Sequence, residues 1–483
     1  MTKTVDAPTG RDRQRTPLEA LAGTGFVRIA DARRSEGNHI ELLRDGPEIF
    51  PRWLDAIEHA ERTVHLENYV LQEDGLGQSF ADALITAAGR GVRCRVLYDW
   101  LGCLRRTSRA FWDRLRRAGV EVRCYNPPAL GHPLGSISRD HRKVLCVDGR
   151  LGFTGGICIG HDWVGDPERG IPPWRDTAVA IRGPAVADLE ATFSDSWGHA
   201  GGAMPSDDPG TPDSAPPEGN LQAWVIAGQP ESMGLYRLEQ LVAEIAERSL
   251  WLTDAYFAAT TGYVHALSDA ARAGVDVRLL VPGSSNFPLV RAISLAEYRP
   301  LLEAGVRVFE WDGPMLHAKT AVSDGCWSRV GSSNSNLASW ISNRELDITI
   351  HGQDFASQME EMYERDLANA TEIVLTDNRV RSTAPYKGDH PEHRSSGRGR
   401  LLAGTVGMGS SVGATLTRHR ALGPGEAGIL VAAGASLAVL GTLALMFPPI
   451  LAYPLGVVAA WLGVVLLIRA WKIHSGKNSK AGK

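Results

Sequence analysis

The sequence predicts an α/β protein with two similar lobes in tandem, followed by a transmembrane helical hairpin. Two observations indicate this arrangement: stretches of the first half of the chain recur in the second half, and residues 427–468 contain no charged side chain. The chain has 483 residues, of which 43% are hydrophobic and 22% are charged. It can therefore build sizeable cores, and global disorder is excluded.

Two stretches carry the internal repeat. Residues 60–66 (AERTVHL) resemble residues 246–252 (AERSLWL), and residues 115–122 (LRRAGVEV) resemble residues 302–308 (LEAGVRV). Because both pairs are separated by nearly the same length of chain, we interpret the repeat as two lobes of one fold that follow each other.

The same succession of elements is expected within each lobe. An Ala/Leu-rich stretch predicts a helix that ends near Gly91 in lobe one and near Gly274 in lobe two, because glycine favours the conformation that ends a helix. The apolar runs that follow, residues 94–98 and 277–281, predict buried strands. Alternating helices and strands indicate α/β lobes whose sheets are covered by helices.

We expect lobe one to span residues 41–204 and lobe two to span residues 220–378. A Pro-rich polar linker joins them at residues 205–219. Three other segments are polar or basic: a mobile N-terminal segment (residues 1–40), a basic Gly/Ser-rich juxtamembrane segment (379–425) and a basic tail (471–483). The two lobes therefore make up the folded body of the protein.

Residues 426–470 predict two transmembrane helices. About 20 apolar residues cross a bilayer core of about 30 Å, and the uncharged span holds two such lengths, separated by Phe447-Pro448-Pro449. Basic residues flank both outer ends, so the positive-inside rule places both ends and the body on the cytoplasmic side of the cell (inner) membrane. The alternative is a buried helical hairpin of a soluble core, although soluble helices rarely lack a polar face for so long.

The charge is distributed unevenly along the chain. Residues 379–483 contain 13 Lys or Arg against 3 Asp or Glu, a net charge of +10, whereas residues 1–378 contain 38 against 52, a net charge of −14. The basic tail suits an anionic membrane surface. The acidic body is a poor match for nucleic-acid phosphates, so we expect no nucleic-acid partner.

The cysteines and the first residues argue against a secreted or zinc-binding protein. The six cysteines are scattered and include no C-x-x-C pair, which excludes a disulfide scaffold and makes a structural zinc site a poor interpretation. The first residues contain no apolar h-region, so we expect no secretory signal peptide.

One chemical motif, H-x-K-x4-D, occurs once in each lobe. Its members are His141, Lys143 and Asp148 in lobe one, and His317, Lys319 and Asp324 in lobe two. On a strand, positions i and i+2 face the same side, so each histidine is expected beside its lysine. An imidazole can attack phosphorus or carry a proton, and an ammonium offers three donors to phosphate oxygens. The repetition of this motif at matching positions of the two lobes favours a catalytic function over a solvated charge cluster.

This paired motif makes the chain resemble the phospholipase D superfamily, and further stretches make it look like the bacterial cardiolipin synthase branch. These stretches include residues 67–69 (ENY), 153–156 (FTGG), 315–319 (MLHAK) and 331–334 (GSSN). The resemblance covers residues 45–378. It implies two phospholipase D-like lobes that pack face to face and form one shared active site around a phosphodiester, with no need for a metal, a cofactor or an oligomer.

The resemblance also implies a covalent mechanism. One histidine attacks phosphorus and forms a phosphohistidine, while the other protonates the departing alcohol and then deprotonates the acceptor. By analogy, His141 is assigned as the nucleophile and His317 as the acid–base group. The lysines of both motifs supply positive charge to the five-coordinate transition state. The two motif aspartates are expected to stabilise each lobe beneath the site.

Each histidine also needs a partner for its second ring nitrogen. Asp176 and Glu345 stand at the family's positions for this role; the alternative is that they are ordinary surface carboxylates. Ser332 and Asn334 are expected to bind the phosphate, unless their segment is a simple Gly/Ser turn. Three aromatic residues either line the lipid entry or belong to the core: Tyr69, Tyr256 and Phe257.

Three positions depart from the family pattern. Cys158 stands where an asparagine usually lies, and a thiol is a weak donor, so one phosphate contact is weakened or replaced. Asn336 and Ala338 stand where cardiolipin synthases usually carry aspartate and arginine. The hairpin is C-terminal here, whereas many cardiolipin synthases carry membrane helices at the N-terminus. These departures loosen the assignment to cardiolipin synthesis and leave both histidines in place.

The observations leave functions of different classes. The leading hypothesis is a membrane-anchored phosphatidyltransferase that makes cardiolipin and glycerol from two phosphatidylglycerols. The alternative is a phospholipase D that hydrolyses phospholipids to phosphatidic acid. The acidic body counts against a phosphodiesterase that acts on nucleic acid. The two complete motifs count against a non-catalytic membrane scaffold.

Overall fold

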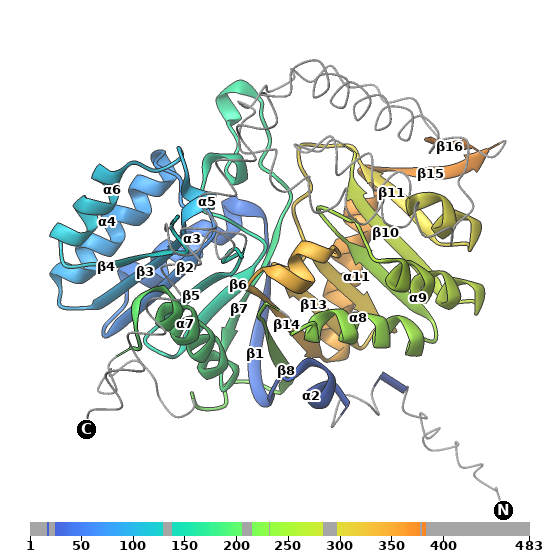
Figure 1. Ribbon diagram of the computed structural model, residues 1–483, viewed down its shortest axis with the longest axis horizontal. Coiled ribbons are helices and arrows are strands. Elements are labelled where there is room, and N and C mark those ends of the chain that lie inside the picture. The colour runs from blue at the N-terminus through green and yellow to red at the C-terminus, as the bar shows by residue number, and fades with distance from the viewer. Residues whose placement is uncertain are drawn as a thin grey trace, which may run out of the picture. The chain divides into compact units, whose positions relative to one another are not determined.

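The computed structural model describes residues 17–18, 25–128, 138–204, 215–230, 232–283, 297–376 and 379–382. Within these residues, sixteen strands form one continuous sheet in the order β16-β15-β11-β10-β9-β12-β13-β14-β8-β1-β7-β6-β5-β2-β3-β4. Figure 1 shows the strands and helices of lobe one in blue and green, and those of lobe two from green to orange.

The described elements divide between the two lobes. Lobe one contains β1 (Arg34–Arg44), α3 (Asp45–Glu58), β2 (Thr63–Asn68), α4 (Gly75–Gly89), β3 (Arg93–Asp99), α5 (Trp100–Cys103), α6 (Arg109–Arg117), β4 (Glu121–Tyr125), β5 (Lys143–Val147), β6 (Leu151–Gly155), the 3-10 helices η2 (His161–Trp163) and η3 (Pro167–Arg169), β7 (Thr177–Arg182) and α7 (Ala185–Gly201). Lobe two contains β8 (Leu221–Gly228), α8 (Gly234–Ile245), β9 (Ser249–Thr253), α9 (Thr261–Arg272), β10 (Asp276–Pro282), β11 (Arg307–Trp311), β12 (Thr320–Ser323), β13 (Trp327–Gly331), η4 (Ala338–Ser342), β14 (Glu345–His351), α11 (Gln353–Leu367), β15 (Ala370–Thr376) and β16 (Arg379–Ser382). A short helix, α2 (Gly25–Ala30), precedes β1.

The two lobes repeat the same strand order. Lobe one runs β7-β6-β5-β2-β3-β4, and lobe two runs β14-β13-β12-β9-β10-β11. In each lobe the three strands that alternate with helices are parallel, and the three that follow are antiparallel. The prediction of two tandem α/β lobes is therefore confirmed. The expected segment bounds are wrong at both ends of the body, because residues 34–40 belong to β1 and residues 379–382 form β16.

The lobes join through one pair of strands at the centre of the sheet. Strand β1 pairs antiparallel with β7 of its own lobe and with β8 of the other lobe. Strand β8 in turn pairs antiparallel with β14. This central pair places β5 and β12, the strands that follow the two histidines, at corresponding positions on either side of the junction.

The predicted helices and strands lie where the residue pattern indicates. Asp74 caps the start of α4 by accepting the Gly77 amide, and Thr260 caps α9 in the same way. Both helices end before a glycine with positive φ, +92° at Gly91 and +98° at Gly274, a conformation that only glycine adopts at little cost. The apolar runs after these glycines form the buried strands β3 and β10.

Three large hydrophobic clusters hold the described body together. One lies in lobe one around α3 and α4, and a second lies in lobe two around α8 and α9. A third combines side chains from strands of both lobes with α7 and α11. Because this third cluster includes both lobes, apolar burial stabilises their association as well as each lobe alone.

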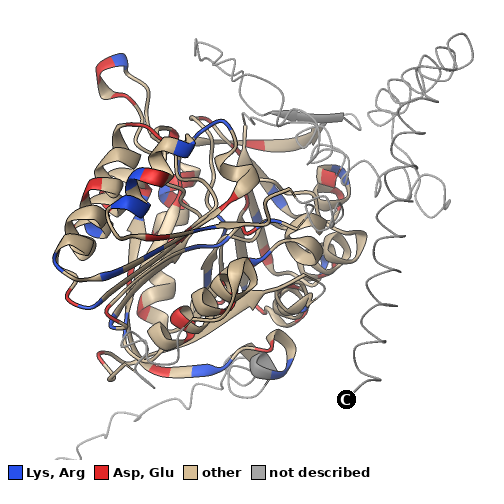
Figure 2. Cartoon of the chain, turned by 60° about the vertical axis from the view of Figure 1, so that its left-hand side comes forward, with Lys and Arg blue, Asp and Glu red and all other residues tan. Residues whose placement is uncertain are grey.

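The described residues do not include several predicted segments. The hairpin at residues 426–470 and most of the juxtamembrane segment and linker lie outside them. Within the described ranges, no helix is both long and apolar enough to span a bilayer. In the view of Figure 2, positively and negatively charged residues are interspersed along the helices of lobe one.

Candidate active site

The two motif histidines lie at equivalent places, immediately before β5 and β12. Each is fixed by a backbone hydrogen bond to the opposite lobe. The His141 amide donates to the Arg344 carbonyl at 2.9 Å, and the His317 amide donates to the Arg175 carbonyl at 2.7 Å. The prediction that both histidines lie within strands is therefore slightly wrong, because their amides bond across the lobe junction and not along the ladder of β5 or β12.

Each histidine binds a carboxylate from the other lobe. His141 Nδ1 lies 2.8 Å from Glu345 Oε2, and His317 Nδ1 lies 2.8 Å from Asp176 Oδ2. Both carboxylates are almost completely buried, with 1% exposure for Glu345 and none for Asp176. They are therefore not ordinary surface carboxylates. Each of these two motif histidines therefore takes its carboxylate from the other lobe, so neither pair is complete within one lobe.

Both carboxylates stay ionised in spite of their burial. Burial raises the pKa of Asp176, but its pairing with His317, together with the charge of Lys319, lowers the pKa below the usual value. The pKa of Glu345 is lowered in the same way, by His141, Lys143 and the Ser332 hydroxyl acting against burial. An ionised carboxylate can only accept, so each Nδ1 carries the proton and each Nε2 keeps its lone pair for chemistry.

Positive charge gathers around the two imidazoles. The pKa of His317 is lowered to about 3 by burial and by the charge of Lys319, against the opposing effect of Asp176. Burial also lowers the pKa of His141, with Glu345 raising it and Lys143 lowering it. Both histidines are therefore neutral at pH 7 in the free protein, which leaves Nε2 of each unprotonated.

The motif lysines lie beside their own histidines, as the i, i+2 spacing predicts. Lys143 Nζ donates to the His141 carbonyl, and Lys319 Nζ donates to the His317 carbonyl. Lys319 Nζ also lies 3.0 Å from His317 Nδ1. Burial lowers the pKa of Lys319 to about 8, with Asp176 opposing and Lys143 adding to the shift. Two ammonium groups at the histidines form a site suited to an anionic phosphodiester.

A tyrosine contacts each histidine. The rings of Tyr69 and His141 meet edge to face with centroids 4.9 Å apart, and those of Tyr256 and His317 do so at 6.0 Å. The neighbouring lysine ammonium lies 5.4 Å from the Tyr69 ring and 5.9 Å from the Tyr256 ring. Both tyrosines therefore belong to the site, whereas Phe257 is 1% exposed and belongs to the core of lobe two.

The motif aspartates bind backbone and do not approach the histidines' reactive nitrogens. The Asp148 carboxylate accepts the amides of residues 61–63 at 2.7–3.0 Å, and the Asp324 carboxylate accepts the amides of residues 247–249 at 2.8–3.0 Å. Each aspartate has positive φ, 54° and 52°, in the turn after its strand. As expected, these residues fasten the start of β2 and β9 beneath the site, and the geometry supports no contact with substrate.

Ser332 supports Glu345. Its hydroxyl donates to Glu345 Oε2 at 2.6 Å and accepts the Leu346 amide at 2.9 Å. The Asn343 side chain donates to the other carboxylate oxygen at 3.2 Å. Ser332 thus positions Glu345 in this structure, and its contact with the phosphate stays a prediction.

Asn334 and Cys158 occupy equivalent places in the two lobes, three residues after the ends of β13 and β6. Asn334 is 5% exposed, and its Oδ1 has no hydrogen-bond partner among the described residues. Cys158 is 1% exposed; burial raises the pKa of its thiol, while Lys143 acts in the opposite direction. Only lobe two thus offers a side-chain amide here. Asn336 instead caps backbone, accepting the Ser339 amide and donating to the Tyr256 carbonyl.

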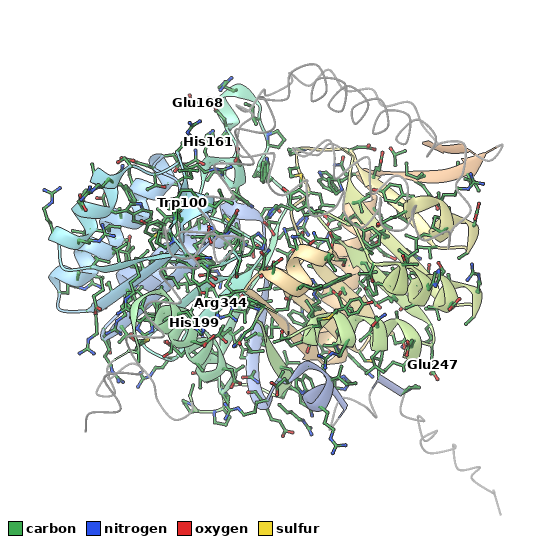
Figure 3. The ribbon with its side chains drawn as sticks, viewed as in Figure 1. Trp100, His161, Glu168, His199, Glu247 and Arg344 are labelled. Atoms are coloured by element: carbon green, nitrogen blue, oxygen red, sulfur yellow. The ribbon has the colours of Figure 1, made fainter. Side chains whose placement is uncertain are left out.

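Sequence reasoning missed the groups that position the two carboxylates. Arg175 precedes Asp176 and pairs with Asp366, at 2.8 Å between Nη2 and Oδ2, while Arg344 precedes Glu345 and pairs with Asp195. Figure 3 labels Arg344 near the junction of the lobes. The repeated Arg–carboxylate dipeptide could have revealed this equivalence. Trp163 was also missed: its indole N–H donates to Asp176 Oδ2 at 2.8 Å.

Comparison with known proteins agrees with this geometry. The family described as "Cardiolipin synthase, PLD-like domain" matches residues 53–163 and 241–367. The chain is 33% identical over 365 residues to a cardiolipin synthase of Geobacillus thermodenitrificans, covering 74% of this chain and 71% of that one. It is 33% identical over 347 residues to cardiolipin synthase A of Pseudomonas syringae pv. syringae, covering 71% of each. The solved phosphatidylserine synthase of Haemophilus influenzae shares the fold, with a TM-score of 0.58 at 14% identity over 73% of this chain and 91% of that one.

Proposed function

The chain belongs to the phospholipase D superfamily and is a phosphatidyltransferase of its cardiolipin synthase-like branch, and from this premise we propose that it converts two phosphatidylglycerols into cardiolipin and glycerol. The observation that carries the proposal is the pair of histidines, each held by a buried carboxylate of the opposite lobe, with a lysine beside each. This arrangement supplies a nucleophile, a proton carrier and positive charge for one phosphodiester.

The reaction proceeds in two displacements at one phosphorus atom. In the first, Nε2 of one histidine forms a bond to phosphorus while the bond to the glycerol oxygen breaks, and the other histidine gives that oxygen a proton. In the second, the hydroxyl of another phosphatidylglycerol attacks phosphorus, its proton goes to the second histidine, and the P–N bond breaks. One phosphodiester is exchanged for another, so the reaction is close to balanced and reversible.

The assignment of roles follows the resemblance, with His141 as nucleophile and His317 as acid–base group. Burial and the neighbouring lysines lower the pKa of both rings and so favour their neutral forms in the free protein. A bound phosphodiester places a negative charge between the lysines and raises both pKa values, which lets the acid–base histidine take up its proton in the complex.

The proposed site of action is the cytoplasmic surface of the inner membrane. In this proposal the hairpin at residues 426–470 crosses the membrane twice and anchors the catalytic body at that surface. The basic segments on either side of that hairpin favour a surface rich in anionic lipid. Phosphatidylglycerol serves there as donor and acceptor, and tethering raises the effective concentration of its glycerol hydroxyl at the site. No nucleic-acid partner and no oligomer are required.

The test uses the purified full chain in phosphatidylglycerol vesicles, with lipid products separated by mass spectrometry. We expect cardiolipin and free glycerol as the main products, with little phosphatidic acid. Phosphatidic acid as the main product from every donor would replace the proposal by the hydrolytic alternative. Cleavage of single-stranded DNA without any lipid product would exclude both. A cardiolipin-type product only from another donor, such as phosphatidylethanolamine, would change the substrate and retain the reaction class.

A further inference from the structure

We infer that Trp163 is a positioning residue for the reaction: its indole N–H holds Asp176, and through Asp176 it holds His317 in the reactive tautomer. The inference rests on the proposed participation of His317 in the chemistry. It applies whether His317 acts as acid–base group or as nucleophile, because both roles need a proton on Nδ1 and a free lone pair on Nε2.

The first support is the shared acceptor atom. Trp163 Nε1 and His317 Nδ1 both lie 2.8 Å from the same oxygen, Asp176 Oδ2. The other oxygen, Oδ1, accepts the Thr177 amide at 2.8 Å. Three donors therefore fix a carboxylate that has no exposure to water. Gly156 leaves room for it, because a Cβ at that position would collide with Asp176 Oδ1.

The second support is the rigid placement of Trp163. The residue ends η2, is 2% exposed, and belongs to the hydrophobic core of lobe one. Its ring meets His317 edge to face with centroids 5.3 Å apart, and it packs against Trp174 at 4.8 Å. An indole N–H cannot titrate or rotate away, so Asp176 has a fixed donor within lobe one and is itself a fixed acceptor for the histidine of lobe two.

The third support is the contrast with the other half of the site. Glu345 receives its extra hydrogen bonds from the Ser332 hydroxyl and the Asn343 side chain, both of its own lobe. Asp176 has no hydroxyl at the equivalent place, because the residue there is Gly156. Trp163 thus replaces the serine of the other half-site with a donor of a different kind.

The decisive variant is Trp163→Phe, which keeps an aromatic ring and removes the N–H. We expect kcat to fall about ten- to a hundredfold, as for other residues that orient a reactive ligand, with little change in KM. Without the indole donor, Asp176 attracts the imidazolium of His317 more strongly, against Lys319 and Lys143, which also face it. In a plot of kcat against pH, the limb that depends on His317 should therefore shift to higher pH by roughly one unit.

Two controls separate positioning from packing. Trp53→Phe makes the same truncation in the same core, at an indole whose Nε1 has no hydrogen-bond partner among the described residues, and should leave the pH profile unchanged. Benzothienylalanine at position 163 keeps the ring volume and replaces N–H with sulfur, so it should reproduce the Trp163→Phe profile even if the phenylalanine variant folds poorly.

A second readout does not depend on lipid turnover. In ¹⁵N-histidine-labelled protein, with His317 identified by comparison with His317→Gln, the Nδ1–H tautomer should dominate in the wild type and its proton should exchange faster in the position-163 variants. If the wild-type protein showed no lipid activity, the proposed function would be wrong, but the NMR measurement of the His317 tautomer would still test the role of Trp163. An unchanged His317 tautomer, exchange rate and pH profile in the benzothienylalanine protein would overturn the inference and reduce Trp163 to a packing residue.

Discussion

Glu345 of lobe two binds His141 of lobe one, with 2.8 Å between Oε2 and Nδ1, and the corresponding pair of Asp176 and His317 crosses the lobe junction in the opposite direction. Because each lobe supplies the carboxylate that binds the other lobe's histidine, the complete site forms only when the two lobes are associated. The shared hydrophobic cluster and the β1–β8 pair that hold the lobes together are therefore also what holds each imidazole in its tautomer.

Replacing Glu345 with glutamine should lower kcat by about 10³- to 10⁴-fold, with KM changed much less, because an amide can donate to Nδ1 and so favours the wrong tautomer of His141. Ser332→Ala removes one of the donors to Glu345 and should cost only about tenfold. The measurement is initial rate on phosphatidylglycerol vesicles, with folding checked by circular dichroism. Full activity of a folded Glu345→Gln protein would show that the pair is structural.

Replacing Asp324 with asparagine should destabilise the protein by about 2–4 kcal/mol, because one carboxylate accepts three backbone amides at the start of β9. Asparagine tolerates the positive φ of this turn, so the change isolates the lost charge. Turnover per folded molecule should be kept. Asp269→Asn, which breaks only an exposed ion pair with Arg272, should change stability by about 0.5 kcal/mol or less. Equal effects of the two variants on urea unfolding would contradict this interpretation.

Local pattern was enough to predict the repeated elements, and tertiary geometry was needed for the site. The glycines at positions 91 and 274 and the apolar runs after them report backbone conformation and burial, which are local properties, so β3 and β10 could be predicted from the sequence. The motif histidines could be found because their chemistry is repeated. Which carboxylate binds which histidine could not, because Asp176 and Glu345 each follow their own lobe's motif in the chain and the exchange arises from the pairing of β1 with β8.

Two site residues show further limits of sequence reasoning. Ser332 lies in a segment that suits a phosphate, but its hydroxyl donates to Glu345, a partner on another strand that the local sequence pattern does not indicate. Trp163 lies in a short 3-10 helix without hydrophobic periodicity, so its role has no sequence signal beyond its presence near the motif.

The two motif histidines should both be indispensable. His141→Ala and His317→Ala should each reduce turnover to background, because neither imidazole can attack phosphorus and carry the leaving-group proton at once. In His317→Asn, incubation with labelled phospholipid should trap a phosphatidyl group on His141, located by peptide mass spectrometry. Label on His317 in the reciprocal His141→Asn variant would reverse the assigned roles. Substantial turnover by either alanine variant would contradict a single shared site.

The fall of kcat/KM at high pH should reflect the deprotonation of Lys319. Its pKa is lowered to about 8, chiefly by burial, so kcat/KM, which reflects the free enzyme, should fall above about pH 8 as the ammonium loses its charge. Stability should respond with the opposite sign. Between about pH 8 and 10.5 the unfolded chain binds the extra proton, so the contribution of Lys319 to the free energy of unfolding rises with pH. Lys319→Met should remove that rise. A kcat/KM profile that stays flat to pH 10 would contradict the lowered pKa.

Removal of residues 426–483 should release a folded body from the membrane. The uncharged span 427–468 is the segment predicted to cross the bilayer, whereas the described body has its own cores in both lobes and one cluster common to the two. The truncated protein should therefore appear in the soluble fraction after a salt wash, with an unfolding transition like that of the full chain and with slower turnover of vesicle lipid. As a control, an unrelated apolar helix fused to the end of the truncated chain, in place of residues 427–446, should restore its sedimentation with membranes. Protease added outside intact cells should leave the body uncut, because the basic flanks of the hairpin place it on the cytoplasmic side. If the truncated chain still sediments with washed membranes, the main anchor lies in the body, and the hairpin is then not what brings the two histidines to the lipid surface.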